Sequence, residues 1–256
     1  MNWVRGRGTT SLLLDLAQIA VIDGRTTRSA RSMSNNAALL LGGAAGISVV
    51  VLLLPFLPDF SYRVRLEWLR LTTSELSDEE KRRLSSTGVL EVMGPEHVLH
   101  LSELDQNGHQ NNARYVRELC FSRRLFCTRL GIWRVLKQFG ANLFIASQTI
   151  RYRREQFLFQ RFKVQSRLSC FSDKDGCLYI ESRFIDASSG FVNAVHLCRY
   201  KLITGKGKEP MLTPSKLLSL AGFNTQNIPQ SPDSIPKISF WNMANEASSK
   251  ELNPRN

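Results

Sequence analysis

The order of apolar and polar positions divides the chain into regions of different character. The first is uncharged: within residues 37–58, positions 37–54 are Ala, Leu, Gly, Ile, Val and one Ser. A helix needs about 20 apolar residues to cross the hydrocarbon core of a bilayer. With Phe56 and Leu57 included, this stretch predicts one transmembrane or signal-anchor segment over 37–58. A cleaved signal peptide and a buried helix of a soluble domain are the alternatives.

The residues before this stretch predict no packed structure. Residues 1–36 contain five Arg against two Asp, and we expect a disordered amino-terminal extension that loosely matches a transit peptide. Met33 directly precedes the apolar stretch and is an alternative start. By the positive-inside rule, the long form places the amino terminus in the cytosol, whereas a start at Met33 places the remaining chain there.

Residues 59–92 are typical of a linker with a short amphipathic helix. Phe60 and Tyr62 are aromatic residues of the kind found at membrane interfaces. Residues 72–86 (TTSELSDEEKRRLSS) are polar and amphipathic, and Ser77 followed by Glu80 fits a capping box at the start of a helix.

Residues 93–204 have the periodicities of a folded domain. The segment HVLHLSELD, which starts at His97, alternates like a strand. Apolar positions three and four apart in 112–130, with no Gly or Pro, predict a long amphipathic helix that Gly131 closes. Four strands are expected after it, at 143–151, 162–170, 177–186 and 191–202.

The last three expected strands are joined by the short turns SDKDG and SSG, which predicts an antiparallel meander. One face of such a sheet must be covered, and the long helix can cover it. The fold class is therefore α+β, with an antiparallel sheet wrapped around one long helix. Residues 205–256 are polar and indicate a carboxyl-terminal tail whose last ordered piece lies at 238–252.

The net charge of +12, from 34 Lys and Arg against 22 Asp and Glu, favours anionic partners. Nucleic acid is an unlikely partner, because no Gly-flanked aromatic RNA signature and no helix-turn-helix pattern accompanies the charge. The expected strands carry a set of cations that either holds the phosphates of coenzyme A or forms a solvated sheet face. These are Arg151, Arg153, Arg154, Arg161, Lys163 and Arg167.

The five cysteines are scattered without a CxxC pair or zinc spacing, so we expect reduced thiols. No His, Asp and Glu cluster has the spacing of a metal site, and neither a metal nor a cofactor is predicted. No Asn-x-Ser/Thr sequon occurs, which argues weakly against a secreted glycoprotein.

Candidate chemistry lies where the first strand meets the long helix. Asp105 falls in the connecting turn, and Gly108 permits a tight turn and close approach of a ligand. Asn111 or Asn112 is suited to cap the helix, whose free N–H groups can polarise a carbonyl oxygen. Tyr115 lies one turn further, facing the core or a cavity. Considered alone, Asp105 and His109 also fit purely structural hydrogen bonding.

These residues, spaced D-x-x-G-H-x-N-N-x-x-Y, resemble the signature of hotdog-fold thioesterases of the 4-hydroxybenzoyl-CoA thioesterase type. The string NNARY (111–115), the turn Ser189–Gly190 before Phe191, and the closing NEASS resemble the animal group called thioesterase superfamily member six. That group also begins with a short hydrophobic segment. The likeness covers roughly residues 37–252.

The resemblance implies a hotdog fold preceded by one transmembrane helix, a homodimer and an acyl-CoA or other acyl thioester as substrate. It assigns the role of nucleophile or general base to Asp105, and polarisation of the carbonyl to the amides of Gly108 and His109. Asn111, Asn112 and Tyr115 complete the expected substrate-binding set. Glu103 replaces an acid that is frequent in the family and is not counted as catalytic. Glu118 either pairs on the surface or points into the cavity.

Two functions follow as hypotheses. The first is hydrolysis of acyl thioesters at a membrane, which we expect to be the endoplasmic reticulum; secretion after signal cleavage and a mitochondrial location are alternatives. The second is a catalytically inactive lipid-binding or scaffolding module of the same membrane.

Overall fold

A computed structural model describes residues 57–204 and 212–252. The predicted extension 1–36 and nearly all of the predicted membrane segment 37–58 lie outside these residues. Within the described residues, no helix has both the length and the apolar character that crossing a membrane requires.

The domain is built on a six-stranded antiparallel sheet in the order β1-β4-β5-β6-β3, with β2 also pairing with β4. The strands are β1 (Glu91–Met93), β2 (His97–Val98), β3 (Ala141–Tyr152), β4 (Arg161–Ser172), β5 (Cys177–Asp186) and β6 (Val192–Thr204). The meander β4-β5-β6 is confirmed, and its turns fall at the predicted positions. The strand predicted from His97 to Asp105 is wrong, because only β2 forms and a 3-10 turn, η2 (Leu101–Glu103), follows.

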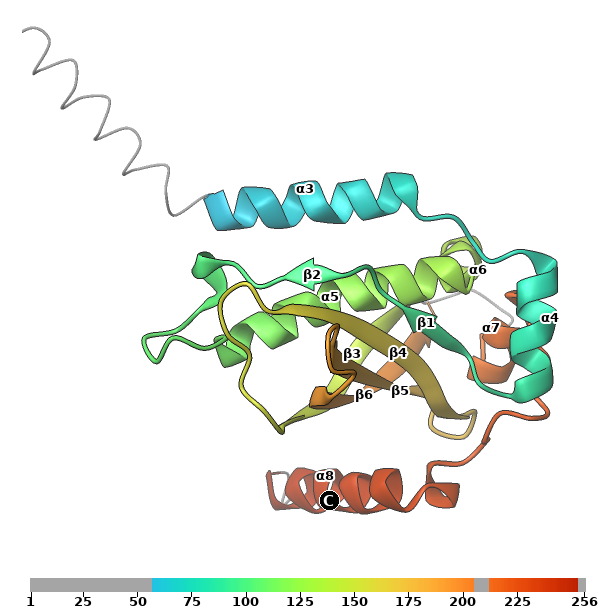
Figure 1. Cartoon of the computed structure of the whole chain (residues 1–256). Helices are drawn as coiled ribbons and strands as arrows, with labels where there is room; N and C mark the ends of the chain where they lie inside the picture. Colours follow the sequence, from blue (N-terminus) through green and yellow to red (C-terminus); the bar gives the residue numbers. More distant parts are fainter. Residues whose placement is uncertain (1–56, 205–211, 253–256) are drawn as a thin grey trace, which may run out of the picture. The chain divides into compact units, whose positions relative to one another are not determined.

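One face of the sheet packs against α5 (Asn112–Arg129), the predicted long helix (Figure 1). Alternate residues of β4 are buried on this face, including Phe162, Val164 and Leu168. Gly131 has φ 71° and begins a further helix, α6 (Ile132–Phe139), which the sequence did not predict. The sheet around one long helix gives a hotdog-like α+β fold, as expected.

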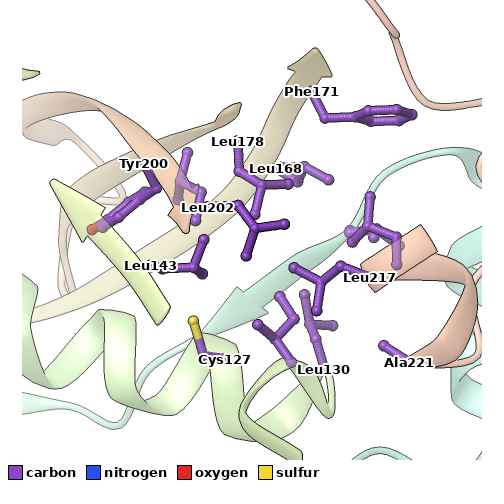
Figure 2. Close-up of a cluster of buried hydrophobic side chains, with 14 of the residues drawn as sticks. Cys127, Leu130, Leu143, Leu168, Phe171, Leu178, Tyr200, Leu202, Leu217 and Ala221 are labelled. Carbon is purple, nitrogen blue, oxygen red and sulfur yellow. The ribbon is translucent and has the colours of Figure 1, made fainter. Parts of the chain in front are cut away.

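The main core lies between the sheet and the helices α5, α6 and α7 (Pro214–Leu220). Figure 2 shows Leu217 pointing toward Leu130 and the strand residues, so a segment from the polar region after residue 204 completes this core. The sequence did not predict α7, because its apolar residues are too few to show a period.

The opposite sheet face carries α8 (Pro236–Leu252), predicted as an ordered piece at 238–252 (Figure 1). Ile238 is fully buried in a cluster with Cys170, Tyr179 and Leu197. The amide of Asn242 donates a hydrogen bond of 2.8 Å to the Tyr179 hydroxyl. Burial and hydrogen bonding therefore both fix α8 to the sheet.

Two helices precede the sheet. The predicted capping box is confirmed in α4 (Asp78–Thr87), where Ser77 and Glu80 satisfy each other's backbone N–H groups. The other helix, α3 (Leu57–Thr72), falls in the expected linker and was not predicted. All five cysteines are free, as expected.

Candidate active site

The turn that contains Asp105 is closed on itself by backbone hydrogen bonds. The Asp105 N–H donates to the His109 carbonyl at 2.9 Å, and the Gly108 N–H donates to the Asp105 carbonyl at 3.1 Å. Gly108 has φ 80°, in the left-handed region that favours glycine. The turn thus places Asp105 and His109 side by side at the entrance of α5.

The carboxylate of Asp105 faces His109. One oxygen, Oδ1, accepts the Asn107 N–H at 2.8 Å, and the other, Oδ2, lies 3.3 Å from Nδ1 of His109. The side chains are 21% and 24% exposed, so both are reachable from solvent. A carboxylate at Nδ1 orients an imidazole and leaves Nε2 for a ligand. The structure therefore links Asp105 and His109, for which separate roles were expected from the sequence.

The start of α5 uses some of its N–H groups and leaves others open. Asn111 is the N-cap, and its Oδ1 accepts the Ala113 N–H at 2.9 Å. The Gly108 N–H is engaged in the turn, whereas the N–H groups of His109 and Asn112 have no hydrogen-bond partner in the described part of the chain. Open donors at a helix start attract anions and carbonyl oxygens.

Tyr115 lies in an aromatic wall one turn into α5. Its ring is 5.1 Å from that of Tyr152 and 4.9 Å from that of Phe184, both in edge-to-face geometry. Burial raises the pKa of Tyr115 above the ordinary tyrosine value. The hydroxyl therefore stays protonated and can act as a hydrogen-bond donor.

An open cavity of about 450 Å³ lies beside this turn and the start of α5. Four of its lining residues belong to the expected site or adjoin it: His109, Gln110, Asn112 and Tyr115. The other four lie at the end of β3 or just after it: Tyr152, Arg153, Arg154 and Glu155. Asp105 does not line it. The cavity therefore meets His109 directly and Asp105 through His109.

Gln110 is the unexpected member of the site. It is only 2% exposed and lines the cavity, yet neither atom of its side-chain amide has a hydrogen-bond partner in the described structure. Buried amides are normally paired, so Gln110 is an exception at the edge of the cavity. No sequence signal marked it, because Gln110 is one of the unmatched positions of the motif.

The loop between β3 and β4 supports the turn and was also missed. The Gln110 N–H donates to the Gln156 carbonyl at 2.8 Å, and the Phe157 N–H donates to the Gln160 side chain at 3.0 Å. Gln160 in turn donates to Asp186, at the end of β5. The only sequence signal for these contacts is that two glutamines flank an aromatic run.

Glu118 takes neither of the two roles expected for it. It does not pair on the surface of α5, and it does not line the cavity beside Tyr115. Its buried carboxylate binds Arg65 of α3 through two hydrogen bonds of 2.6 and 2.7 Å. Ligand atoms of Glu118, His97 and Glu103 lie within 4.8 Å of one another, which resembles a metal-binding group. Arg65 binds the Glu118 carboxylate, and Nε2 of His97 lies 2.9 Å from the Glu103 carboxylate, so protein groups already engage both carboxylates.

The geometry of Glu103 agrees with a structural role. Burial alone would raise the pKa of its carboxyl, but hydrogen bonds from His97 and from the His100 N–H hold that pKa below its usual range. Glu103 also accepts the Asn111 N–H through its carbonyl at 2.9 Å. It therefore holds the turn rather than facing the cavity.

Comparison with known proteins assigns the family. A family profile described as "Thioesterase-like superfamily" matches residues 99–220, which include the turn, α5 and the strands β3 to β6. Protein THEM6 of Danio rerio is 33% identical over 161 residues, covering 61% of this chain and 74% of that protein. The chain belongs to the THEM6 family of the thioesterase-like superfamily.

A second THEM6 protein and a solved structure are also similar to the chain. Protein THEM6 of Xenopus laevis is 32% identical over 150 residues, covering 59% of this chain and 67% of that protein. Among solved structures, the probable thioesterase YbaW of Escherichia coli is similar with a TM-score of 0.46 and 19% identity, over 52% of this chain and 98% of that one. The resemblance inferred from the motif is confirmed at the level of the family.

Proposed function

We propose that this THEM6-family protein hydrolyses acyl thioesters in the cavity at the start of α5. The observation that carries the proposal is that an imidazole oriented by a carboxylate and open N–H groups at a helix start lie beside one cavity. Hydrolysis of a thioester requires a base for water and donors for the oxygen that becomes negative, and these groups supply both.

The reaction follows from the positions of these groups. Nε2 of His109 takes a proton from water while Asp105 holds the proton on Nδ1, and the water oxygen bonds to the thioester carbonyl carbon. The N–H groups of His109 and Asn112 stabilise the resulting oxyanion. When the carbon–sulfur bond breaks, the proton returns from His109 to the thiolate, giving a free acid and a thiol. In this proposal Asp105 orients the base, in place of the role of nucleophile or general base that the resemblance implies for it.

Thiol release from acyl-CoAs of several chain lengths tests this mechanism. General-base catalysis contributes about 10²–10⁴-fold, so Asp105→Asn and His109→Gln should each lower kcat/KM by about 10²-fold or more. Gln106→Ala is the matched control, because Gln106 is exposed in the same turn and does not line the cavity. Turnover that persists in both variants would overturn the mechanism.

The carrier of the acyl group is proposed to be coenzyme A or another phosphorylated thiol. A second open cavity of about 420 Å³ on the α8 side of the sheet is lined by Arg151, Arg153, Arg183 and Lys237 against the single carboxylate of Glu181. Arg153 lines both cavities, so a ligand can extend from one to the other around the end of β3. Arginine guanidinium groups bind phosphates in a bidentate manner.

Competition by adenosine 3′,5′-bisphosphate tests the carrier. Arg151→Glu should raise KM for acyl-CoA and weaken inhibition by this nucleotide about tenfold, which corresponds to one lost charge-assisted contact of about 1.4 kcal/mol. Arg82→Glu is the charge-matched control, because Arg82 lies on α4 outside both cavities. Equal effects of both variants would indicate general charge attraction instead of a site.

A non-catalytic lipid-binding or scaffolding module is the second candidate. The observation that favours it is that Asp105 already accepts one N–H group and contacts His109, and does not itself line the cavity. Absence of turnover over the whole acyl-CoA panel, together with saturable binding of acyl chains, would support this function over hydrolysis.

We also propose that the stretch 37–58 anchors the protein in a membrane of the endoplasmic reticulum as a single span. The uncharged run in the sequence supports a membrane span. Protease protection of the carboxyl terminus in sealed vesicles tests the sidedness. Loss of membrane association on alkaline carbonate extraction would contradict the anchor.

A homodimer formed along β3 is proposed as the assembly. β3 is the outer strand of the described sheet, and Phe144 and Ile145 are exposed on it. An open strand edge with apolar side chains is a template for pairing, and the cavity lies at the end of this strand. Ile145→Lys should lower the mass measured in mild detergent to that of a monomer, whereas a monomeric parent would contradict the dimer.

A further inference from the structure

The helix α3 has two apolar faces, and one of them is open to solvent. Four large apolar side chains, each between 51% and 76% exposed, lie along it at Phe60, Val64, Trp68 and Leu71. With 3.6 residues per turn these positions fall within an arc of about 80°. They therefore form one continuous surface, here called the outer stripe.

The inner face of α3 fixes the direction in which the outer stripe points. Arg65 binds Glu118 of α5 and stacks at 3.9 Å over the ring of Phe121. The ring of Tyr62 lies 5.1 Å from the same phenylalanine, and Leu69 is buried. Figure 1 shows α3 alongside α5, outside the sheet. Rotation of α3 to bury the stripe would break a bidentate ion pair.

The chemistry around the outer stripe fits a lipid surface. Arg63 is exposed on one flank of the stripe, where its guanidinium group can reach a lipid phosphate while the stem follows the apolar boundary. Arg70 lies on the same flank and pairs with the exposed Glu67 at 2.6 Å. Trp and Phe are enriched at membrane interfaces. The uncharged run 37–54 ends six positions before Phe60, so a span there would deliver α3 to the membrane surface.

The size of the outer stripe separates a membrane from a second copy of the chain. Large side chains have about 150–250 Å² each, so four that are roughly half to three-quarters exposed offer on the order of 500 Å². A standard protein interface needs about 800 Å² on each side. A helix with a narrow apolar face and a cation at its boundary is a usual form of a segment that lies on a bilayer.

We propose that α3 lies in the plane of an anionic membrane surface, with the outer stripe in the boundary between headgroups and acyl chains. This inference rests on the proposed membrane anchor and is independent of hydrolysis. It makes the folded domain itself a membrane-contacting unit. The cavity at the start of α5 is then held at a fixed orientation to the bilayer.

Quenching of tryptophan fluorescence by brominated lipids tests the contact in the full chain. The protein is reconstituted in vesicles of phosphatidylcholine and phosphatidylserine whose acyl chains carry bromine at a shallow or a deep position. Trp68→Phe removes one of the four tryptophans and keeps the stripe apolar, so the shallow quenching should fall by the contribution of Trp68. Trp241→Phe, on the α8 side of the sheet, should leave that quenching unchanged.

A double substitution tests the outer stripe itself. Val64→Asp with Leu71→Asp should lower shallow quenching of Trp68 several-fold, and folding is expected to persist because both positions are exposed. Phe240→Asp with Met243→Asp is the matched control on the exposed side of α8. Flotation of the vesicles reports membrane attachment separately.

Each outcome decides the inference. If the protein floats with the vesicles but lipid does not quench Trp68, the membrane anchor is supported and the docking of α3 is overturned. Shielding of Trp68 from aqueous acrylamide without lipid quenching would identify a protein partner and also overturn it. Quenching by shallow bromine that is lost in the double variant supports the inference.

Discussion

At the scale of single residues, two buried carboxylates depend on cations, most of which come from other elements of the fold. Glu118 of α5 is paired with Arg65 of α3, and Glu181 of β5 is paired with its neighbour Arg183, with Arg167 of β4 and with Lys237 of α8. A carboxylate in the protein interior is costly when its partner is removed. Residues far apart in the sequence therefore stabilise each other through charge.

Loss of Arg65 should destabilise the fold. We expect Arg65→Ala to lower the free energy of unfolding by about 2 kcal/mol, between the values for surface and fully buried pairs, because Arg65 is partly exposed. Arg63→Ala removes an exposed Arg from the same helix and should change stability by less than about 0.5 kcal/mol. Urea unfolding of both variants measures the difference, and equal effects would argue against the pair.

The contribution of Lys237 should depend on pH. Burial alone would raise the pKa of Glu181, but the hydrogen bond and charge of Lys237, with Arg167 and Arg183, hold it below its usual range. A lowered carboxyl pKa stabilises the fold above the unfolded value of about 4.3 and ceases to do so as pH falls through the folded value.

We therefore expect Lys237→Met to cost about 1 kcal/mol at pH 7, since Lys237 is half exposed. The difference from the parent should shrink as the pH falls below about 4.3. Urea unfolding over a pH series measures it. A difference that is constant with pH would show that Lys237 acts through packing alone.

At the scale of elements, helices and strands with a clear apolar period were predicted from the sequence. Elements that are buried only through contacts with distant parts of the chain were missed. The helix α5 and the strands β4, β5 and β6 show spacing of three and four or of two, and they occur within two residues of their predicted bounds. The strand β1 is three residues long, too short for any period. The apolar residues of α3 are divided between a side that faces a helix and a side that faces solvent. They therefore show no single apolar face, and the segment was predicted to be a linker.

The turn at the candidate site was predictable for a different reason. Gly108 and Asn111 have conformational and capping preferences that act locally, and both take the expected roles. The loop from β3 to β4 reaches the turn only after folding, so the involvement of Gln156 and Gln160 had no local signal. Gln110 illustrates the same limit, because the burial of its side-chain amide without a hydrogen-bond partner arises only in the folded domain.

The left-handed residue after α4 gives a test of turn geometry. Gly88 has φ 67°, and a Cβ atom there would lie 2.4 Å from the carbonyl oxygen of Asn227. Gly190 has φ 70° with no atom within 4 Å of such a Cβ. Gly190→Ala should therefore cost about 1–2 kcal/mol from backbone strain alone.

Gly88→Ala should cost clearly more than Gly190→Ala, because the added methyl group also displaces backbone. Thermal unfolding of the two variants compares them directly. Equal losses of stability would mean that the segment around Asn227 moves away freely and is not fixed to α4.

At the scale of the whole described domain, both faces of the sheet are covered, and the two sides bury thiols. Cys170 lies under α8 and Cys127 in the core on the α5 side, and both are fully buried. Burial raises the pKa of the Cys170 thiol to about 12, with a smaller contribution from Asp233, and burial raises that of Cys127 to about 12 as well. Neither thiolate forms near neutral pH while its cover is in place.

We expect release of α8 to expose one thiol and not the other. Ile238→Asp places an acid in a fully buried position and should detach α8 from the sheet. Cys170 should then react with iodoacetamide, while Cys127 stays unreactive as the internal control. Peptide mapping by mass spectrometry measures both. Equal modification of the two would indicate global unfolding in place of local release.

The helix α5 contacts both the turn of Asp105 and α3, so it connects the proposed membrane contact with the candidate site. This single helix begins at the cap that shapes the turn of Asp105 and, two turns later, carries the carboxylate that binds α3. Glu103, next to the same turn, lies close to Glu118 in the cluster with His97. Under the proposed docking and hydrolysis, a tilt imposed on α3 by thicker or more charged bilayers would be transmitted along α5, a helix of 18 residues. Turnover measured in different vesicles would then report membrane mechanics as well as substrate preference.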